Sequence, residues 1–186
     1  MANVWFTSDL HFGHKNINKF RLEVSSEEDN RKRICEDWED LVTKRDDIYV
    51  LGDAAFTWDT AQEFARLPGR KYLVRGNHDE LSIREYLKYF TEVYGLKKYK
   101  GFWLSHAPIH PDELRGKVNL HGHVHYQSIR KNFSPIYDIK QELDTRYFNM
   151  CVENLWKLGY PSLISLDQVR KELERINTGL GNDNKE

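Results

Sequence analysis

Cysteines are scarce in this sequence: two occur among 186 residues, at Cys35 and Cys151. Neither belongs to a CxxC or similar spacing, which argues against a thiolate zinc site and against the disulfide framework of a small secreted domain. We therefore expect two reduced thiols in a reducing compartment.

Long apolar runs are also missing. No stretch approaches the roughly 20 residues that a membrane-spanning helix requires, and no charged segment followed by an apolar one precedes the first predicted strand, which begins at Val4. These absences predict a soluble, cytoplasmic protein without a membrane partner.

An excess of charge of either sign is absent, because 28 Lys and Arg residues face 29 Asp and Glu residues. Proteins that bind nucleic acid backbones usually carry a basic excess. A nucleic acid substrate stays open, but broad electrostatic binding is disfavoured. The basic clusters at 97–100 and 130–131 have aromatic neighbours, as a single-strand binding surface does, yet such runs in a neutral protein are usually only solvated.

Short apolar runs alternate with helical patterns, which predicts a single α/β domain over residues 1–177 and a flexible tail over 178–186. A helix is expected to start at Ser25 or Ser26 and to bury one apolar face. The other predicted helices cover 60–67 and 167–176. The predicted strands are 4–7, 48–51, 72–74, 102–104, 118–120 and 148–152.

Polar residues with metal-binding side chains follow most of these strands, directly or within three residues: Asp9, Asp53, Asn77, His106 and His123. In α/β proteins the loops at the carboxyl ends of strands converge on one edge, where ligands bind. The sequence therefore predicts one site built from five segments.

Histidine distribution supports this prediction. All eight histidines lie within the first 125 residues, and none lies in the last 61. Asp9 alone could be a turn or cap residue, and Asn77 alone is most often a turn residue. Taken together, however, the set supplies about seven oxygen and imidazole ligands, as two divalent ions sharing a carboxylate require.

The ordered motifs are Asp9-Leu10-His11, Gly52-Asp53, Gly76-Asn77-His78-Asp79, His106 and Gly122-His123-Val124-His125. This order resembles the calcineurin-like metallophosphoesterase superfamily, and residues 9–17 (DLHFGHKNI) are similar to a small bacterial and phage-borne branch of it. The resemblance implies a two-sheet sandwich flanked by helices. It also implies a phosphoesterase in which a metal-bridging hydroxide attacks phosphorus.

Carried over position by position, the resemblance implies two divalent metal ions. The first is held by Asp9, His11, Asp53 and His125, and the second by Asp53, Asn77, His106 and His123. The implied catalytic residues are His78, which stays off the metals as a proton donor, and the bridging Asp53. Mn²⁺ is the preferred expectation, with Fe²⁺, Co²⁺, Ni²⁺ and Zn²⁺ as alternatives, because mixed oxygen and imidazole ligands suit all of them.

Three further residues are candidates for contact with substrate or with the ligands: His14, Arg75 and His121. His14 could equally be a solvated loop residue, and Arg75 could point away from the site. His121 alternates with His123 and His125, so that an extended segment would place all three on one face. His110 is expected on the loop surface.

The chain departs from the protein serine/threonine phosphatases, which it otherwise resembles, because residues 52–58 lack their GDxxDRG arginine. Without arginines to grip a dianionic monoester, a phosphodiester such as a cyclic or linear nucleotide is the easier substrate. Phe56 and Trp58 offer flat surfaces on which a base could stack, although simple packing is the stronger expectation.

Three alternatives remain at this stage. One is a nucleotide phosphomonoesterase or pyrophosphohydrolase, which would need a basic pocket beyond the metals. The second is a non-catalytic scaffold that keeps the fold, which the complete ligand set disfavours. The third is a nucleic-acid-binding module with structural zinc, which would need a closed four-ligand site.

Overall fold

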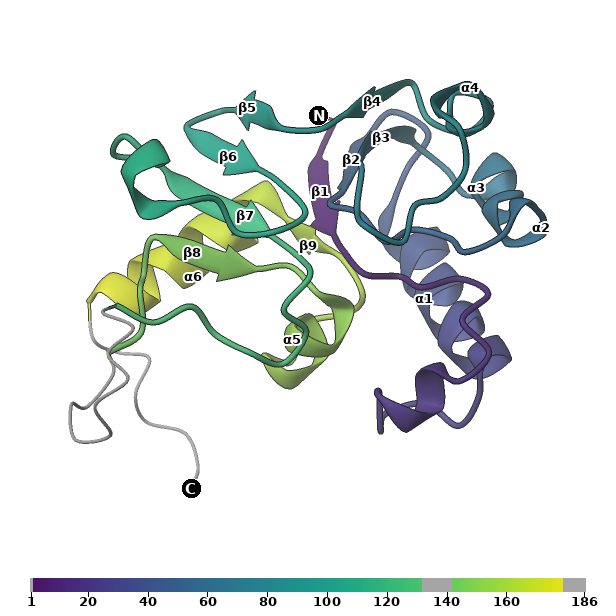
Figure 1. Ribbon diagram of the computed structural model, residues 1–186, viewed down its shortest axis with the longest axis horizontal. Helices are drawn as coiled ribbons and strands as arrows, with labels where there is room; N and C mark the ends of the chain where they lie inside the picture. The colour runs from purple at the N-terminus through teal and green to yellow at the C-terminus, as the bar shows by residue number, and fades with distance from the viewer. Residues whose placement is uncertain (1, 132–141, 179–186) are drawn as a thin grey trace.

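The computed structural model describes residues 2–131 and 142–178 of the chain, and Figure 1 shows their arrangement in two sheets with helices around them. One sheet has the order β4-β3-β2-β1-β9 and the other has the order β5-β6-β7-β8. The predicted α/β sandwich of two sheets flanked by helices is confirmed. The predicted tail lies outside the described residues from 179 onward.

The first sheet is parallel except at one edge, because β9 runs antiparallel to β1. In the second sheet β6, β7 and β8 are parallel, and β5 is antiparallel to β6. The strands of the first sheet are β1 (Val4–Thr7), β2 (Asp47–Val50), β3 (Arg70–Val74), β4 (Glu92–Tyr94) and β9 (Ile164–Ser165). Those of the second are β5 (Lys97–Tyr99), β6 (Phe102–Leu104), β7 (Val118–His121) and β8 (Tyr147–Asn149).

The helices are α1 (Glu27–Leu41), α2 (Trp58–Ala61), α3 (Glu63–Arg66), α4 (Ile83–Tyr86), α5 (Val152–Lys157) and α6 (Leu166–Asn177), with short 3₁₀ turns η1 (Ile17–Lys19) and η2 (Pro111–Glu113). Helix α1 begins after Ser26, whose side chain accepts the backbone N–H of Asp29, as a capping serine does. Of the two predicted starts, Ser26 is therefore the N-cap. None of the described helices combines the length and the apolarity that crossing a membrane would require.

Two apolar cores hold the layers together. The first lies between one face of the first sheet and the helices beside it, and it includes Trp38 of α1 and Phe64 of α3. The second lies between the two sheets and is closed by α6 through Leu166, Val169 and Leu173. The alternating side-chain directions of the strands supply both cores.

Two predicted elements differ from the structure. The predicted strand 148–152 is wrong beyond Asn149, because the chain turns there and α5 begins at Val152. The turning segment links the two sheets: the N–H of Met150 donates to His121 of β7, and the N–H of Val152 donates to Ser8. The predicted helix 60–67 is instead two short helices, α2 and α3, which meet at Gln62.

Candidate active site

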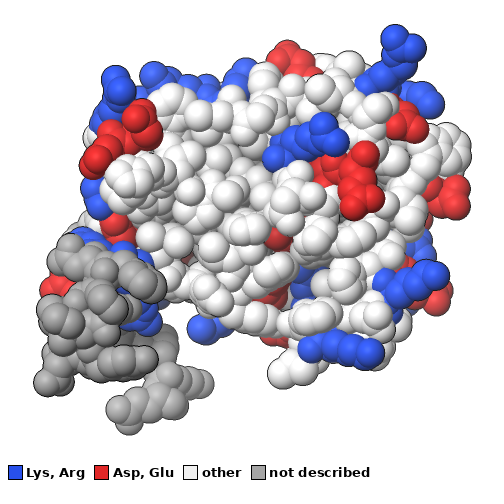
Figure 2. Space-filling model, viewed as in Figure 1, with Lys and Arg blue, Asp and Glu red and all other residues white. Residues whose placement is uncertain are grey.

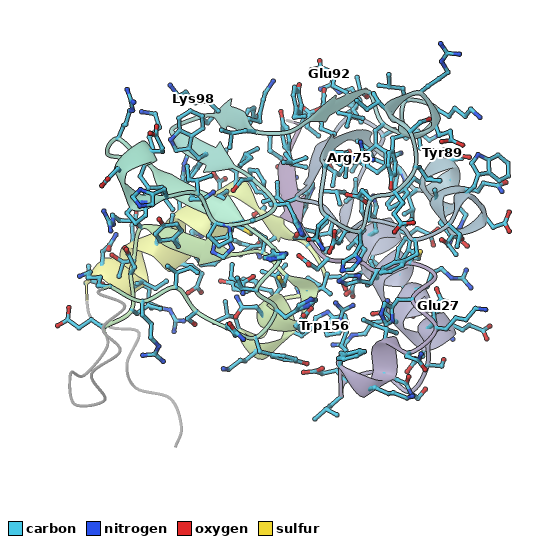
Figure 3. The ribbon with its side chains drawn as sticks, viewed as in Figure 1. Glu27, Arg75, Tyr89, Glu92, Lys98 and Trp156 are labelled. Carbon is cyan, nitrogen blue, oxygen red and sulfur yellow. The ribbon has the colours of Figure 1, made fainter. Side chains whose placement is uncertain are left out.

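The predicted ligands lie at the carboxyl ends of β1, β2, β3, β6 and β7, where loops from both sheets meet. Backbone hydrogen bonds extend the pairing of β1 and β2 into these loops, from the Asp9 N–H to Gly52 at 3.0 Å and from the His11 N–H to Asp53 at 2.9 Å. Figure 3 draws the side chains of the described residues on the ribbon and labels Arg75, which follows β3 directly. The ligand-bearing segments therefore converge as predicted.

A first cluster of metal-binding atoms forms around His11. Its Nε2 lies 3.6 Å from Asp9 Oδ1 and 3.8 Å from Asp53 Oδ2. On the other side, Nε2 of His125 lies 3.9 Å from the same Asp9 oxygen. Asp9, His11 and Asp53 offer ligand atoms close enough to hold one ion.

Hydrogen bonding within this first cluster is incomplete. Among the described residues, Asp9 Oδ1 and His11 Nε2 are buried side-chain atoms without a hydrogen-bond partner. Burying such atoms unpaired is costly, and a divalent cation between them would remove that cost. The residues present therefore fit a metal ion.

A second cluster forms around Asn77. Its Oδ1 lies 2.8 Å from His106 Nε2 and 2.9 Å from His123 Nδ1, and these two nitrogens are 3.2 Å apart. Nε2 of His106 is also 3.5 Å from Asp53 Oδ1. Carboxylate, amide oxygen and imidazole nitrogens thus point at one place, and the donor set suits a divalent first-row metal.

Asp53 is the member that the two clusters share. Its Oδ2 faces His11 and its Oδ1 faces His106. The carboxylate is 2 % exposed, so water screens it little. The geometry matches the bridging position that the resemblance implies for this residue.

Unusual backbone conformations concentrate at these residues. Positive φ angles occur at seven non-glycine positions of the described chain, and five of them are candidate ligands: Asp9, His11, Asp53, His123 and His125. Such angles are uncommon for residues with a Cβ, and strained residues tend to cluster at functional sites. The surrounding structure therefore holds these side chains in place at some cost in stability.

Glycines in the motifs permit close approach of the segments. A Cβ at Gly76 would lie 2.2 Å from Asp53 Oδ1, and one at Gly122 would lie 1.9 Å from Ser8 Oγ and 2.2 Å from Asp9 Oδ2. No side chain fits at those distances. Glycine is therefore required at positions 76 and 122 for these segments to approach Asp53 and Asp9.

Asp79, the last residue of the Gly76–Asp79 motif, supports the site from behind. Its carboxylate accepts the backbone N–H groups of Asp53 at 3.0 Å, Ala54 at 2.9 Å and Gly76 at 2.7 Å. Burial raises the pKa of this carboxyl, and the N–H donors of Gly76 and Ala54 oppose that rise. The side chain thereby fixes the loop that carries Asp53.

Glu153 and Arg21 are site residues that the sequence interpretation missed. Glu153, at the start of α5, contacts Nδ1 of His125 and forms a 2.8 Å ion pair with Arg21. Arg21 also donates to the backbone oxygen of Asp9 at 2.8 Å and to Asn30 at 2.6 Å. Glu153 binds Nδ1 of His125, so the other ring nitrogen, Nε2, is directed at the first cluster. Carboxylates often orient metal-bound histidines in this way.

Electrostatics reinforces this arrangement. The hydrogen bond to Glu153 raises the pKa of His125, although burial opposes the rise. Burial by itself raises the pKa of Asp9, but His11, His106 and the Ser8 hydroxyl together outweigh it and hold the pKa of this carboxyl well below its usual value. Asp9 also accepts a hydrogen bond from the thiol of Cys151 at 3.2 Å. Cys35 and Cys151 are both buried and free.

We expect Glu153→Gln to lower the free energy of unfolding by about 3–5 kcal/mol, because it leaves the buried Arg21 without its counterion. The measurement is urea denaturation of the metal-free protein. Glu63→Gln is the matched control: Glu63 pairs with Arg31 and with Arg66, each at 2.6 Å, but these side chains are partly exposed, so a loss of about 1 kcal/mol is expected. Equal losses in the two variants would show that the buried ion pair of Glu153 with Arg21 stabilises the fold no more than the partly exposed pairs of Glu63 do.

His78 lies at the exposed side of the site. Its backbone N–H donates to Asp53 Oδ1 at 2.8 Å, which places the residue without using its ring. The imidazole stacks on Phe56, with 5.1 Å between ring centroids, and is 5.9 Å from the ring of His11. The ring is thus held beside the first cluster, on the side open to solvent.

The remaining candidates differ in position. The ring of His14 lies 5.8 Å from that of His11, at the edge of the site. Arg75 donates to the backbone oxygens of Asp79 at 2.9 Å and Leu81 at 3.1 Å. His121 is buried with Nδ1 at 2.9 Å from the oxygen of Gly122, and burial lowers its pKa to about 4.

Two further residues considered from the sequence lie away from the ligands. His110 is exposed and caps η2. Trp58 is 42 % exposed and faces the amino group of Lys88.

Comparison with known proteins agrees with this geometry. The calcineurin-like phosphoesterase family matches residues 2–172. The Gene 66 protein of Mycobacterium phage D29 is 31% identical, with 97% of this chain and 100% of the phage protein covered. That of phage L5 is also 31% identical, over 67% of this chain and 78% of the phage protein. An uncharacterized protein of Methanocaldococcus jannaschii is 31% identical over 67% of this chain and 70% of its own length.

Among solved structures, a protein of unknown function from Aquifex aeolicus has a TM-score of 0.65 and 29% identity to this chain. The similarity covers 92% of this chain and 99% of that one. The family match spans both sheets and every motif of the site. The chain therefore belongs to the calcineurin-like phosphoesterase family and is a metal-dependent phosphoesterase.

Proposed function

We propose that this protein hydrolyses a phosphodiester, such as a cyclic or linear nucleotide, at two divalent metal ions that share Asp53. The observation that carries the proposal is the position of that carboxylate. Its Oδ2 lies 3.8 Å from His11 in one cluster and its Oδ1 lies 3.5 Å from His106 in the other. A pair of such ions would neutralise the phosphate and activate a water molecule for in-line attack.

The proposed ligands fall into two sets, one for each ion. In this proposal Asp9, His11 and His125 hold one ion with Asp53, and Asn77, His106 and His123 hold the other. Only two of the seven ligands are anionic, so two divalent ions would leave a positive surplus that suits an anionic phosphate. Mn²⁺ is the expected metal, and the same donors also suit Fe²⁺, Co²⁺, Ni²⁺ and Zn²⁺.

His78 is proposed to donate a proton to the leaving oxygen. Its ring is held by Phe56 rather than by a ligand cluster, and it faces the open side of the site. A positioned imidazole is a common general acid. Asp53 orients this segment as well, because its Oδ1 accepts the His78 N–H.

Diester specificity is supported by the contacts of Arg21 and Arg75. Arg21 is buried and engaged with Glu153, Asn30 and the backbone of Asp9, and Arg75 is engaged with two backbone oxygens. Neither guanidinium is free to grip a dianionic phosphate bidentately, which is how arginine recognises such groups. A monoesterase or pyrophosphohydrolase would need that grip, and a non-catalytic scaffold would not need both clusters.

A substrate panel with the Mn²⁺-loaded protein tests the diester proposal. We expect kcat/KM for bis(p-nitrophenyl) phosphate to exceed that for p-nitrophenyl phosphate by about 10-fold or more. The reason is that no free arginine is proposed to bind the dianionic monoester, and each such charged hydrogen bond is worth about 1.5–3 kcal/mol. A cyclic nucleotide and single-stranded DNA complete the panel. A preference for the monoester would contradict diester specificity and favour the monoesterase alternative.

We also propose that the protein is located in the cytoplasm. Cys35 and Cys151 are buried free thiols, which supports a reducing environment such as the cytoplasm.

A further inference from the structure

A cavity of about 370 Å³ opens directly beside the first ligand cluster. One side of it is formed by His11, His125 and His78, which the proposed function already uses. The other side is formed by residues that the proposed function does not use. These are His14, Ile17, Phe20 and Tyr126.

The walls of this cavity consist mainly of rings. Among the described residues that line the cavity, only Ile17 has a side chain without a ring. Phe20 is 64 % exposed and meets His14 edge to face at 5.7 Å between centroids. Tyr126 comes from the loop after β7, and its hydroxyl donates to Glu23 at 2.6 Å. An aromatic side chain left open to solvent beside a catalytic site has a free face for stacking.

Among the described residues, the lining of the cavity contains no Lys, Arg, Asp or Glu. A second phosphate group would therefore find no fixed positive charge there. The wider surface agrees, because the face in Figure 2 carries Lys and Arg mainly around its edge rather than in one broad patch. Neither a nucleoside polyphosphate nor a long polynucleotide backbone is favoured by this distribution.

We propose that this cavity is a base-binding subsite, which holds the purine or pyrimidine ring of a single nucleotide while its phosphodiester lies at the ligand clusters. The inference rests on the proposed function and specifies its substrate. Stacking of a base on aromatic side chains is tolerant of sequence because each base has a flat face. The volume falls within the range of about 300–1,000 Å³ typical of small-molecule sites.

The test compares two inhibitors that differ only in the base. AMP and ribose 5-phosphate carry the same phosphate and sugar, and each is titrated against hydrolysis of bis(p-nitrophenyl) phosphate by the Mn²⁺-loaded protein. AMP is expected to inhibit about 5- to 150-fold more tightly, which is the contribution of one stacked base. Equal inhibition constants would overturn the subsite.

Phe20→Ala locates the effect. This variant should bring the inhibition constant of AMP close to that of ribose 5-phosphate without changing the latter. Leu22→Ala is the matched control, since Leu22 is 89 % exposed on the same loop and does not line the cavity; it should leave the preference for AMP intact. A preference that survives Phe20→Ala would also overturn the subsite.

Failure of the proposed function would look different. In that case the Mn²⁺-loaded protein would not hydrolyse the aryl diester, whatever the inhibitor. Calorimetric titration of AMP and ribose 5-phosphate into the Mn²⁺-loaded protein then judges the subsite alone. A preference for AMP that Phe20→Ala abolishes would support the subsite, and equal affinities would overturn it.

Discussion

Asp53→Asn is expected to lower kcat/KM for an aryl diester by at least ~100-fold. Loss of a residue that only supports a metal ligand costs up to about 100-fold in activity, and loss of a shared ligand should cost at least as much. The substitution removes the only charge that both clusters share, with Oδ2 facing His11 and Oδ1 facing His106. An amide keeps the shape of the side chain but offers one oxygen in place of two. Affinity for Mn²⁺ should therefore fall at both sites, which calorimetric titration measures independently of turnover.

Two comparisons sharpen this result. Asp59→Asn, at an exposed position of α2, should leave activity and Mn²⁺ binding unchanged. His121→Ala should cost less activity than Asp53→Asn, because His121 is buried against Gly122 and lies behind the ligands. If His121→Ala is the more damaging substitution, the ligands in the Gly122–His125 segment are assigned wrongly.

His78→Ala is expected to lower kcat for a diester with a poor leaving group by about 10²- to 10⁴-fold, the usual contribution of a general acid. The ring lies beside the first cluster, stacked on Phe56. Two bound metals per chain should remain in the variant, as metal analysis can verify. The loss should be smaller for a nitrophenyl diester, because nitrophenolate departs without a proton.

His110→Ala serves as the control for removal of a histidine, since His110 is exposed and caps η2. It should leave both rates unchanged. Loss of a metal from His78→Ala would make His78 a ligand. An equal loss for good and poor leaving groups would make it a residue that positions phosphate rather than an acid.

The sequence predicted the strands well where an apolar run stops at a turn residue. Val4–Thr7 ends before Ser8-Asp9, and the second strand ends before Gly52-Asp53. The convergence of the ligands followed from the parallel order of these strands. A helix cap at Ser26 could also be anticipated, because acidic residues follow it.

Other features depend on contacts that no local pattern contains. The apolar run through Phe148–Val152 resembles a strand, yet pairing with both Ser8 and His121 bends it so that α5 starts at Val152. That bend places Glu153 on His125 and on Arg21, which is 132 positions away in sequence. Strand β9 has two residues, which is too short for alternation to be visible.

The most direct test of the central claim is activity as a function of the number of bound metal ions. The protein is stripped with a chelator, its metal content is measured, and Mn²⁺ is added back in steps while hydrolysis of bis(p-nitrophenyl) phosphate is followed. A site bridged by Asp53 predicts no turnover in the stripped protein and full activity at two Mn²⁺ per chain. Undiminished turnover with no metal bound, or full activity at a single ion per chain, would contradict it.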